Sequence, residues 1–176
     1  MLDVHVIKHN QNAEWIEQCI ASIREAMARA TFHVELHVID GVTGHIGEGR
    51  ANGYAMGSQP YVTCVDDDDY LLPHAFEAIA LALAHEPDAI FPAEMTLQNG
   101  YMLPGHQRHH FAIYRRPILI DHRAWACCGD VAQKVAAEKG RVIDVAQPCY
   151  VHRLYHDSSA RSLRRTHADE LELARG

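Results

Sequence analysis

Short apolar segments alternate with segments of helical periodicity along the first 95 residues, and this order constrains the fold more than any other feature. Residues 4–7, 34–39, 61–65 and 88–91 are rich in β-branched residues or alternate apolar with polar side chains, which is typical of strands. The polar stretch HNQN closes the first strand, Asp40-Gly41 breaks the second, and four aspartates follow the third. We therefore expect short strands that end in polar turns.

Two segments between these strands have helical spacing. In the first, apolar residues recur at intervals of four, three and four: Ile16, Ile20, Ile23 and Met27. The second follows a similar pattern: Leu72, Phe76, Ile79 and Leu83. Asn12 is placed to cap the first helix, and Pro73 is tolerated in the first turn of the second. Residues 44–58 form a glycine-rich segment to which the pattern assigns no element.

The strand, helix, strand, helix order predicts an α/β fold with a mostly parallel central sheet covered by helices on both faces. A chain of 176 residues fits one domain. Ligands of such sheets gather at the carboxyl ends of the strands. We therefore expect His9-Asn10, Asp40-Gly41 and the aspartates 66–69 to face one crevice.

The four aspartates, Asp66 to Asp69, begin at the end of an apolar strand. Adjacent carboxylates raise the cost of ionising one another, so a positive partner is expected. Side chains two apart in an extended chain share a face, which pairs Asp66 with Asp68 and leaves Asp67 and Asp69 on the other side. Beside a diphosphate, such a pair can hold Mg²⁺ or Mn²⁺. The alternative is a solvated acidic turn that caps the next helix.

Composition and charge exclude several classes of protein. Apolar residues make up 48% of the chain and charged residues 22%, which is ordinary for a globular protein. The net charge of −7 argues against a nucleic-acid partner, although Arg161, Arg164 and Arg165 could touch phosphates or form the solvated face of a terminal helix. No apolar run approaches the roughly 20 residues of a membrane span, and the first residues do not resemble a signal peptide. We expect a cytoplasmic protein without a transmembrane segment.

Cysteines and histidines give weaker signals. The five cysteines are an odd number without a C-x-x-C pair, and we interpret them as reduced thiols. His106, His109 and His110 lie within five positions, which raises the hypothesis of a zinc site. Zinc sites usually have paired ligands, and no second matching pair stands out. A polar loop near a substrate site is the favoured interpretation.

Four blocks of the chain together resemble a family 2 glycosyltransferase with the GT-A (nucleotide-diphospho-sugar transferase) fold. The blocks are HNQNAEWIEQCIASI, VELHVIDG, GEGRANGYAMGSQPYVTCVDDDDYLLPHAFEAI and GDVAQKVAAEKGRVIDVAQPCYVHRLYHDSS. The similarity covers about the first 95 residues and resumes over 129–159. It implies a single GT-A domain with a nucleotide-sugar-binding half (1–95), an acceptor and catalytic half (96–160) and a helical tail (161–176).

The resemblance also implies roles for individual residues. Those implied to bind the nucleotide sugar are Asn10, Asp40, Arg50, Asp66 and Asp67. Asp68, with Asp66, would hold the Mn²⁺ or Mg²⁺ ion, and His156 occupies the place of a histidine that helps to hold the metal or the diphosphate in some members. Asp130 falls at the aspartate of the family's "ED", the general base of inverting members.

Each assignment has a structural alternative. Asp130 could be the N-cap of the helix that follows it, a role compatible with catalysis. Asp40 before Gly41 is a common turn pair, and Arg50 could simply pair with Glu48 or another acid. His156 could be a coincidence among 14 histidines.

The chain also departs from the family pattern. Ala51 stands where an asparagine is common, and Gly129 replaces the glutamate of "ED". Residues 95–128, where acceptor-binding elements lie in the family, match no block. Their aromatic and arginine side chains suit sugars or phosphates as well as ordinary edge strands and loops.

The sequence therefore predicts a metal-dependent glycosyltransferase that transfers a sugar from a nucleotide-diphosphate donor, with a UDP-sugar favoured, to an acceptor hydroxyl with inversion. A non-catalytic nucleotide-sugar or glycan-binding protein with a degenerate transferase fold is the alternative. A haloacid dehalogenase-type phosphohydrolase is disfavoured because Tyr70-Leu71-Leu72 follows the aspartates.

Overall fold

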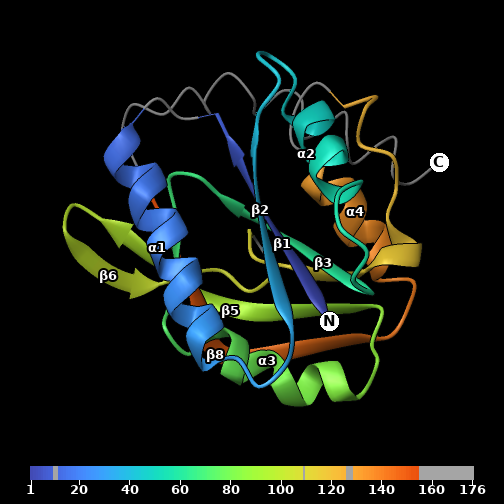
Figure 1. Ribbon diagram of the computed structural model, residues 1–176. Helices are drawn as coiled ribbons and strands as arrows, with labels where there is room; N and C mark the ends of the chain where they lie inside the picture. The colour runs from blue at the N-terminus through green and yellow to red at the C-terminus, as the bar shows by residue number, and fades with distance from the viewer. Residues whose placement is uncertain (10–11, 109, 126–128, 155–176) are drawn as a thin grey trace.

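A computed structural model describes residues 1–9, 12–108, 110–125 and 129–154 of the chain (Figure 1). Its elements are, in order, β1 (Leu2–Lys8), α1 (Ala13–Arg29), β2 (Val34–Asp40), α2 (Ile46–Tyr54), β3 (Tyr61–Asp66), β4 (Tyr70–Leu71), α3 (Ala75–Ala84), β5 (Ala89–Gln98), β6 (Tyr101–Pro104), β7 (Ile113–Arg115), the 3₁₀ turn η1 (Arg116–Ile118), α4 (Asp130–Ala137) and β8 (Val142–Arg153). The predicted alternation of strands and helices over the first 95 residues is confirmed.

The described strands form one sheet in the order β2-β1-β3-β7-β5-β8-β4, with β6 paired to β5. The pairs β1–β2, β1–β3 and β5–β8 are parallel. The short β7 runs antiparallel to both β3 and β5, and β4 and β6 run antiparallel to β8 and β5. The five long strands therefore share one direction, as predicted, and the antiparallel strands come from segments that gave no sequence signal.

Helices cover both faces of this sheet (Figure 1). On one face, α1 and α3 pack with the larger hydrophobic cluster, whose largest helical members are Ile23, Phe76, Ile79 and Leu83. On the other face, Tyr54 of α2 and Ala137 of α4 join a second cluster with Val62, Phe91 and Tyr114. The predicted Asn12 cap is present, because its side chain accepts hydrogen bonds from the backbone N–H groups of Glu14 and Trp15. The helix α3 begins at Ala75, after Pro73, since Tyr70 and Leu71 pair with β8.

The glycine-rich segment contains the helix α2, which the sequence pattern did not predict. Its glycines serve close packing: a Cβ at Gly49 would lie 3.2 Å from Cγ2 of Ile7, and one at Gly53 would lie 3.4 Å from Cδ1 of Ile39. A helix that packs this closely on the sheet needs no stripe of large apolar residues. Hydrophobic periodicity therefore could not reveal it.

Two further expectations can be compared with the described residues. Cys19, Cys64 and Cys149 are buried free thiols, in agreement with the interpretation as reduced cysteines. None of the helices within the described ranges combines the length and the hydrophobicity needed to cross a bilayer.

His5 makes the stability of this core depend on pH. Its ring is fully buried, stacks on His37 and donates from Nδ1 to the carbonyl oxygen of Thr63 at 3.2 Å. Burial lowers its pKa to about 4. The unfolded chain takes up a proton near its ordinary pKa of about 6.5, whereas the folded chain does not.

We therefore expect the wild type to lose up to about 3 kcal/mol of stability from His5 as the pH falls from about 6.5 to about 4. Urea denaturation of His5→Gln should show a shallower loss over this pH range. The exposed His33→Gln is the matched control and should follow the wild type. Parallel pH profiles for His5→Gln and the wild type would contradict the prediction.

Candidate active site

The polar ends of the first three strands meet at one edge of the sheet, as predicted. In the parallel register Lys8 pairs with Asp40, and Ile7 pairs with Asp66. Asp40 forms an ion pair with Lys8 at 2.7 Å, and its side chain is 88% exposed. It is therefore accessible to a ligand at this edge. Asn10 and His156 lie outside the described residues.

The four aspartates form a turn in which two side chains hold the structure. The N–H of Asp69 donates to the carbonyl oxygen of Asp66 at 3.0 Å, so the chain reverses here. Asp67 is buried and accepts a hydrogen bond from the backbone N–H of His9 at 2.8 Å. Asp69 is 1% exposed and accepts from the Tyr150 hydroxyl at 2.6 Å and the Arg153 N–H at 2.7 Å. Asp67 thus ties the turn to the end of β1, and Asp69 ties it to β8.

Asp68 has a different environment from these two anchored residues. It is half-buried, and no ion pair of its side chain is among those of the described residues. Burial, followed by the charges of Asp69, Asp66 and Asp67, raises the pKa of Asp68 to about 7. A carboxylate that is this costly to ionise would be stabilised by a cation.

Arg50 connects Asp66 to Asp130. Its guanidinium, on α2, lies 2.9 Å from Oδ1 of Asp66 and also forms an ion pair with Asp130. Arg50 is only 7% exposed. Burial acts to raise the pKa of Asp66, but Arg50 and the nearby imidazoles of His110 and His152 outweigh it and hold that pKa below its ordinary value. Arg50 therefore pairs with acids other than Glu48, and it holds two predicted site residues together.

Asp130 is the first residue of α4, so the suggested N-cap position belongs to Gly129. Gly129 has a φ of 65°, and a Cβ at this position would collide with the ring of His122. These two constraints favour glycine at position 129 over any residue with a Cβ atom.

Arg153 is a residue of this site that the sequence did not reveal. Its guanidinium donates to the carbonyl oxygen of Asp68 and to the side chain of Gln18. It also lies over the rings of Trp15 and Tyr70, at 5.7 and 4.9 Å from their centroids. The hydrogen bond to the Asp68 carbonyl oxygen holds the backbone of the turn and so fixes the position of Asp68. In the sequence, the only signal for Arg153 is its place at the end of β8.

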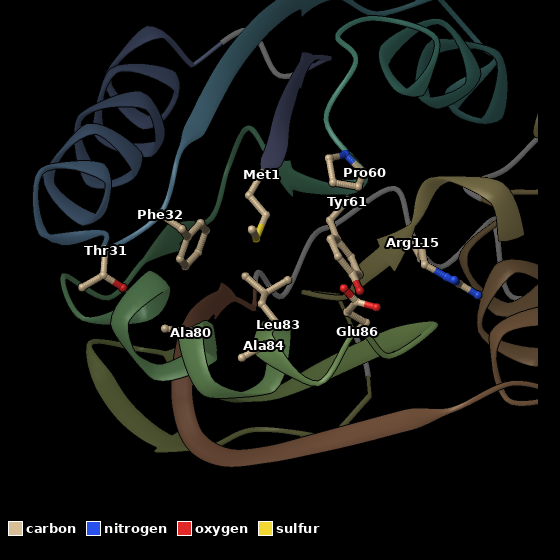
Figure 2. A pocket seen from close by; sticks show the side chains of 10 residues that line it. All are labelled: Met1, Thr31, Phe32, Pro60, Tyr61, Ala80, Leu83, Ala84, Glu86 and Arg115. Carbon is tan, nitrogen blue, oxygen red and sulfur yellow. The ribbon is translucent and has the colours of Figure 1, made fainter.

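An apolar cavity lies elsewhere in the molecule. It has a volume of about 350 Å³ and is lined by apolar side chains including Met1, Phe32, Tyr61 and Leu83 (Figure 2). Met1 and Tyr61 lie at the amino ends of β1 and β3, which is the edge of the sheet opposite the aspartates. The four aspartates, Asp66 to Asp69, therefore do not line this cavity.

Comparison with known proteins bears on the fold. No family model matches the sequence, and no curated protein matches it. The structure is similar to S. aureus TarS 1–349 in complex with UDP-GlcNAc, with a TM-score of 0.71, 17% identity, and coverage of 92% of this chain and 60% of TarS 1–349. The fold is that of the GT-A glycosyltransferases. The predicted fold class is thereby confirmed.

Two further TarS structures agree. TarS 1–349 alone gives a TM-score of 0.71 at 15% identity, covering 98% of this chain and 64% of TarS 1–349. The complex of TarS 1–349 with UDP gives 0.63 at 16% identity, covering 87% of this chain and 60% of TarS 1–349. The chain thus spans about three fifths of the length of TarS 1–349. Identity this low shows the fold alone, and membership of family 2 remains a prediction.

The carboxylates at this edge fit a hard divalent cation. Asp68 and Asp66 offer oxygen atoms, which Mg²⁺ and Mn²⁺ prefer. Burial and the charges of the three neighbouring aspartates raise the pKa of Asp68, and a cation beside it would favour its charged form. The donor set is therefore suitable for the predicted ion.

Single substitutions should distinguish the anchoring role of Asp69 from the role of the half-buried Asp68. We expect Asp69→Asn to lower the free energy of unfolding by about 2–4 kcal/mol, because it disrupts a buried acceptor of several hydrogen bonds. Asp68→Asn should leave stability unchanged or raise it at pH 8 without divalent ions. Its raised pKa means that ionisation, which is largely complete at this pH, costs folding free energy.

Urea denaturation at pH 8 in the presence of a chelator measures both effects. The two variants make the same chemical change one residue apart, so each controls for the other. Equal destabilisation by both substitutions would show that Asp68 is also a structural anchor.

Proposed function

We propose that the protein is a metal-dependent glycosyltransferase that transfers a sugar from a nucleotide-diphosphate donor to an acceptor hydroxyl with inversion. The observation that carries this proposal is the buried Arg50 bridge, which brings Asp66 of the DxD and Asp130 together at the carboxyl edge of a GT-A fold. The two residues are 64 positions apart in the sequence and belong to different elements.

Asp68 and Asp66 are the residues that would hold Mn²⁺ or Mg²⁺, with His156 as a further ligand from outside the described residues. When bound, the ion would neutralise negative charge on the departing diphosphate. Asp67 and Asp69 keep the turn in place through their hydrogen bonds to His9 and to β8. The hydrogen bond from His9 places Asp67 beside the end of β1, which supports the proposed contact of Asp67 with the nucleotide.

Asp130 would accept the proton of the acceptor hydroxyl. Its ion pair with Arg50 favours the carboxylate form, which a general base requires, and fixes the side chain at the start of α4. The side chain keeps partial exposure, at 16%, so that a hydroxyl can approach it. Arg50 thereby acts as a positioning residue for the base, in addition to any contact with the diphosphate.

Asp40 and Asn10 would bind the nucleotide base. Asp40 is the last residue of β2, at the same edge as Asp66, and is exposed, so its carboxylate can accept a hydrogen bond from a uracil N–H. The complexes of TarS with UDP-GlcNAc and UDP make a UDP-sugar the first donor to test. The acceptor would contact residues of the second half of the chain.

The proposal predicts that a panel of UDP-, GDP- and TDP-sugars contains a donor whose turnover requires Mn²⁺ or Mg²⁺. Asp130→Asn should lower kcat by about 10²–10⁴-fold because it removes the proton acceptor. It also removes the ion pair of Asp130 with Arg50, but it leaves the Arg50–Asp66 ion pair, so donor binding should be retained. Asp68→Ala should abolish the dependence on metal together with most of the turnover. Asp144→Asn, which removes a carboxylate near the amino end of β8, is the control and should keep full activity.

Calorimetry and turnover together distinguish the two candidate functions. Metal-dependent binding of a donor without hydrolysis or transfer would favour the non-catalytic binding protein. Unchanged turnover in both Asp68→Ala and Asp130→Asn would overturn the proposed mechanism.

A further inference from the structure

The apolar cavity at the amino edge of the sheet lies between α3 and the amino ends of β1 and β3 (Figure 2). Leu83 of α3 lines it from one side and Met1 from the other, and the ring of Phe32 lies at one end. An engineered cavity of about 150 Å³ binds benzene, and pockets for small molecules begin at roughly 300 Å³. A volume of about 350 Å³ therefore suits a ligand with one aromatic ring and a small polar group.

The other end of the cavity carries two side chains of opposite charge, Glu86 and Arg115. Arg115 is the register partner of Tyr61 across β3 and β7. The Tyr61 hydroxyl donates to the carbonyl oxygen of Pro87 at 3.0 Å, which places the preceding Glu86 beside the same ring. Among the described residues, Arg115 forms its ion pair with Asp88, which does not line the cavity, and none joins it to Glu86. The two charges therefore line the same end of the cavity without pairing with each other.

The fold does not require an acidic side chain at position 86. Glu86 follows the C-cap residue of α3 and has a φ of 49°, in the left-handed region where helices commonly end on glycine. Its side chain is exposed, and the ion pairs of the neighbouring segments join other acids, Glu77 to Arg29 and Asp88 to Arg115. A carboxylate that the helix end does not use is available to a ligand at this end of the cavity.

Two opposite charges at the end of an apolar cavity favour a zwitterion. A ligand with only a carboxylate would meet Glu86, and one with only an ammonium group would meet Arg115. An α-amino acid carries both groups on one carbon, so its ammonium group can pair with Glu86 and its carboxylate with Arg115. The guanidinium group of Arg115 has several N–H donors, more than its pairing with Asp88 requires.

We propose that this cavity binds a free α-amino acid with an aromatic side chain. The ring packs against Met1, Phe32 and Leu83, and the charged groups pair with Glu86 and Arg115. The cavity lies at the edge opposite the aspartates, and its lining residues are distinct from those of the candidate active site. The site therefore does not depend on the proposed transferase activity.

Probes that share a phenyl ring test this site on the wild type: L-phenylalanine, 3-phenylpropionate, which lacks the ammonium group, and 2-phenylethylamine, which lacks the carboxylate. Each is titrated into the whole protein, without a nucleotide sugar or a divalent ion, and followed by NMR of the methyl groups of Met1 and Leu83. We expect L-phenylalanine to shift both sets of resonances and to bind up to about fivefold more tightly than either analogue, as for exposed ion pairs.

Single substitutions then assign the two charged groups. Glu86→Gln should remove the advantage of L-phenylalanine over 3-phenylpropionate, and Arg115→Gln should remove its advantage over 2-phenylethylamine. Glu77→Gln changes an acid of α3 that does not line the cavity, so this control should bind all probes like the wild type. Ala80→Leu places a larger side chain in the cavity and should abolish binding of every probe. Circular dichroism confirms that each variant is folded.

The results that would contradict the proposal are specific. Equal affinities of the wild type for the three probes would show that the charged end does not select the ligand. Absence of methyl shifts with L-phenylalanine, or binding that persists in Ala80→Leu, would show that the cavity is not the site. Because the first two results are measured on the wild type, a substitution that unfolds the chain leaves the proposal testable.

Discussion

The buried ion pairs of Arg50 are the interaction on which the candidate site depends. A guanidinium group presents its donors in a fixed plane and can bind two carboxylates at once, which a lysine ammonium does less well. Here it joins α2 to Asp66 at the end of β3 and to Asp130 at the start of α4. The glycines of α2 make this possible, because they let the helix lie close to β1 and β2 and so carry Arg50 into the sheet edge. Without close packing, the same arginine would be a solvated loop residue.

The aspartate turn shows how a cluster of like charges can be kept in a folded protein. Asp67 and Asp69 are buried, but their carboxylates accept hydrogen bonds from backbone N–H groups, which stabilise the charged form. Arg153 supports the same turn through the carbonyl oxygen of Asp68 and is itself placed against two aromatic rings. The turn is thus fixed by groups that face inward. The half-buried Asp68 keeps a raised pKa, because burial and the charges of the other three aspartates both disfavour its charged form.

Much of the structure of the first 95 residues could be predicted from the sequence, because local patterns determine it. The apolar alternation of β2, the helical spacing in α1 and the Asn12 cap are short-range signals, and the structure contains all of them. The division of the aspartates into two pairs was also predicted, although from an extended chain, whereas the structure produces it in a turn.

The parts that escaped prediction depend on contacts between distant segments. The helix α2 has little apolar periodicity, and the need for glycine at 129 is set by the ring of His122. The short antiparallel strands β4 and β7 exist because longer strands lie beside them. His152 could not be connected with His110 from sequence, since only the pairing of β5 with β8 places it beside the end of the loop that holds His110.

Charge balance limits what this edge of the sheet can bind. Asp66, Asp68 and Asp69 belong to one turn, and Arg50 is already shared between Asp66 and Asp130. A nucleotide diphosphate would bring still more negative charge to this edge. Such a ligand can bind only if cations are present to offset both its own charge and that of the protein.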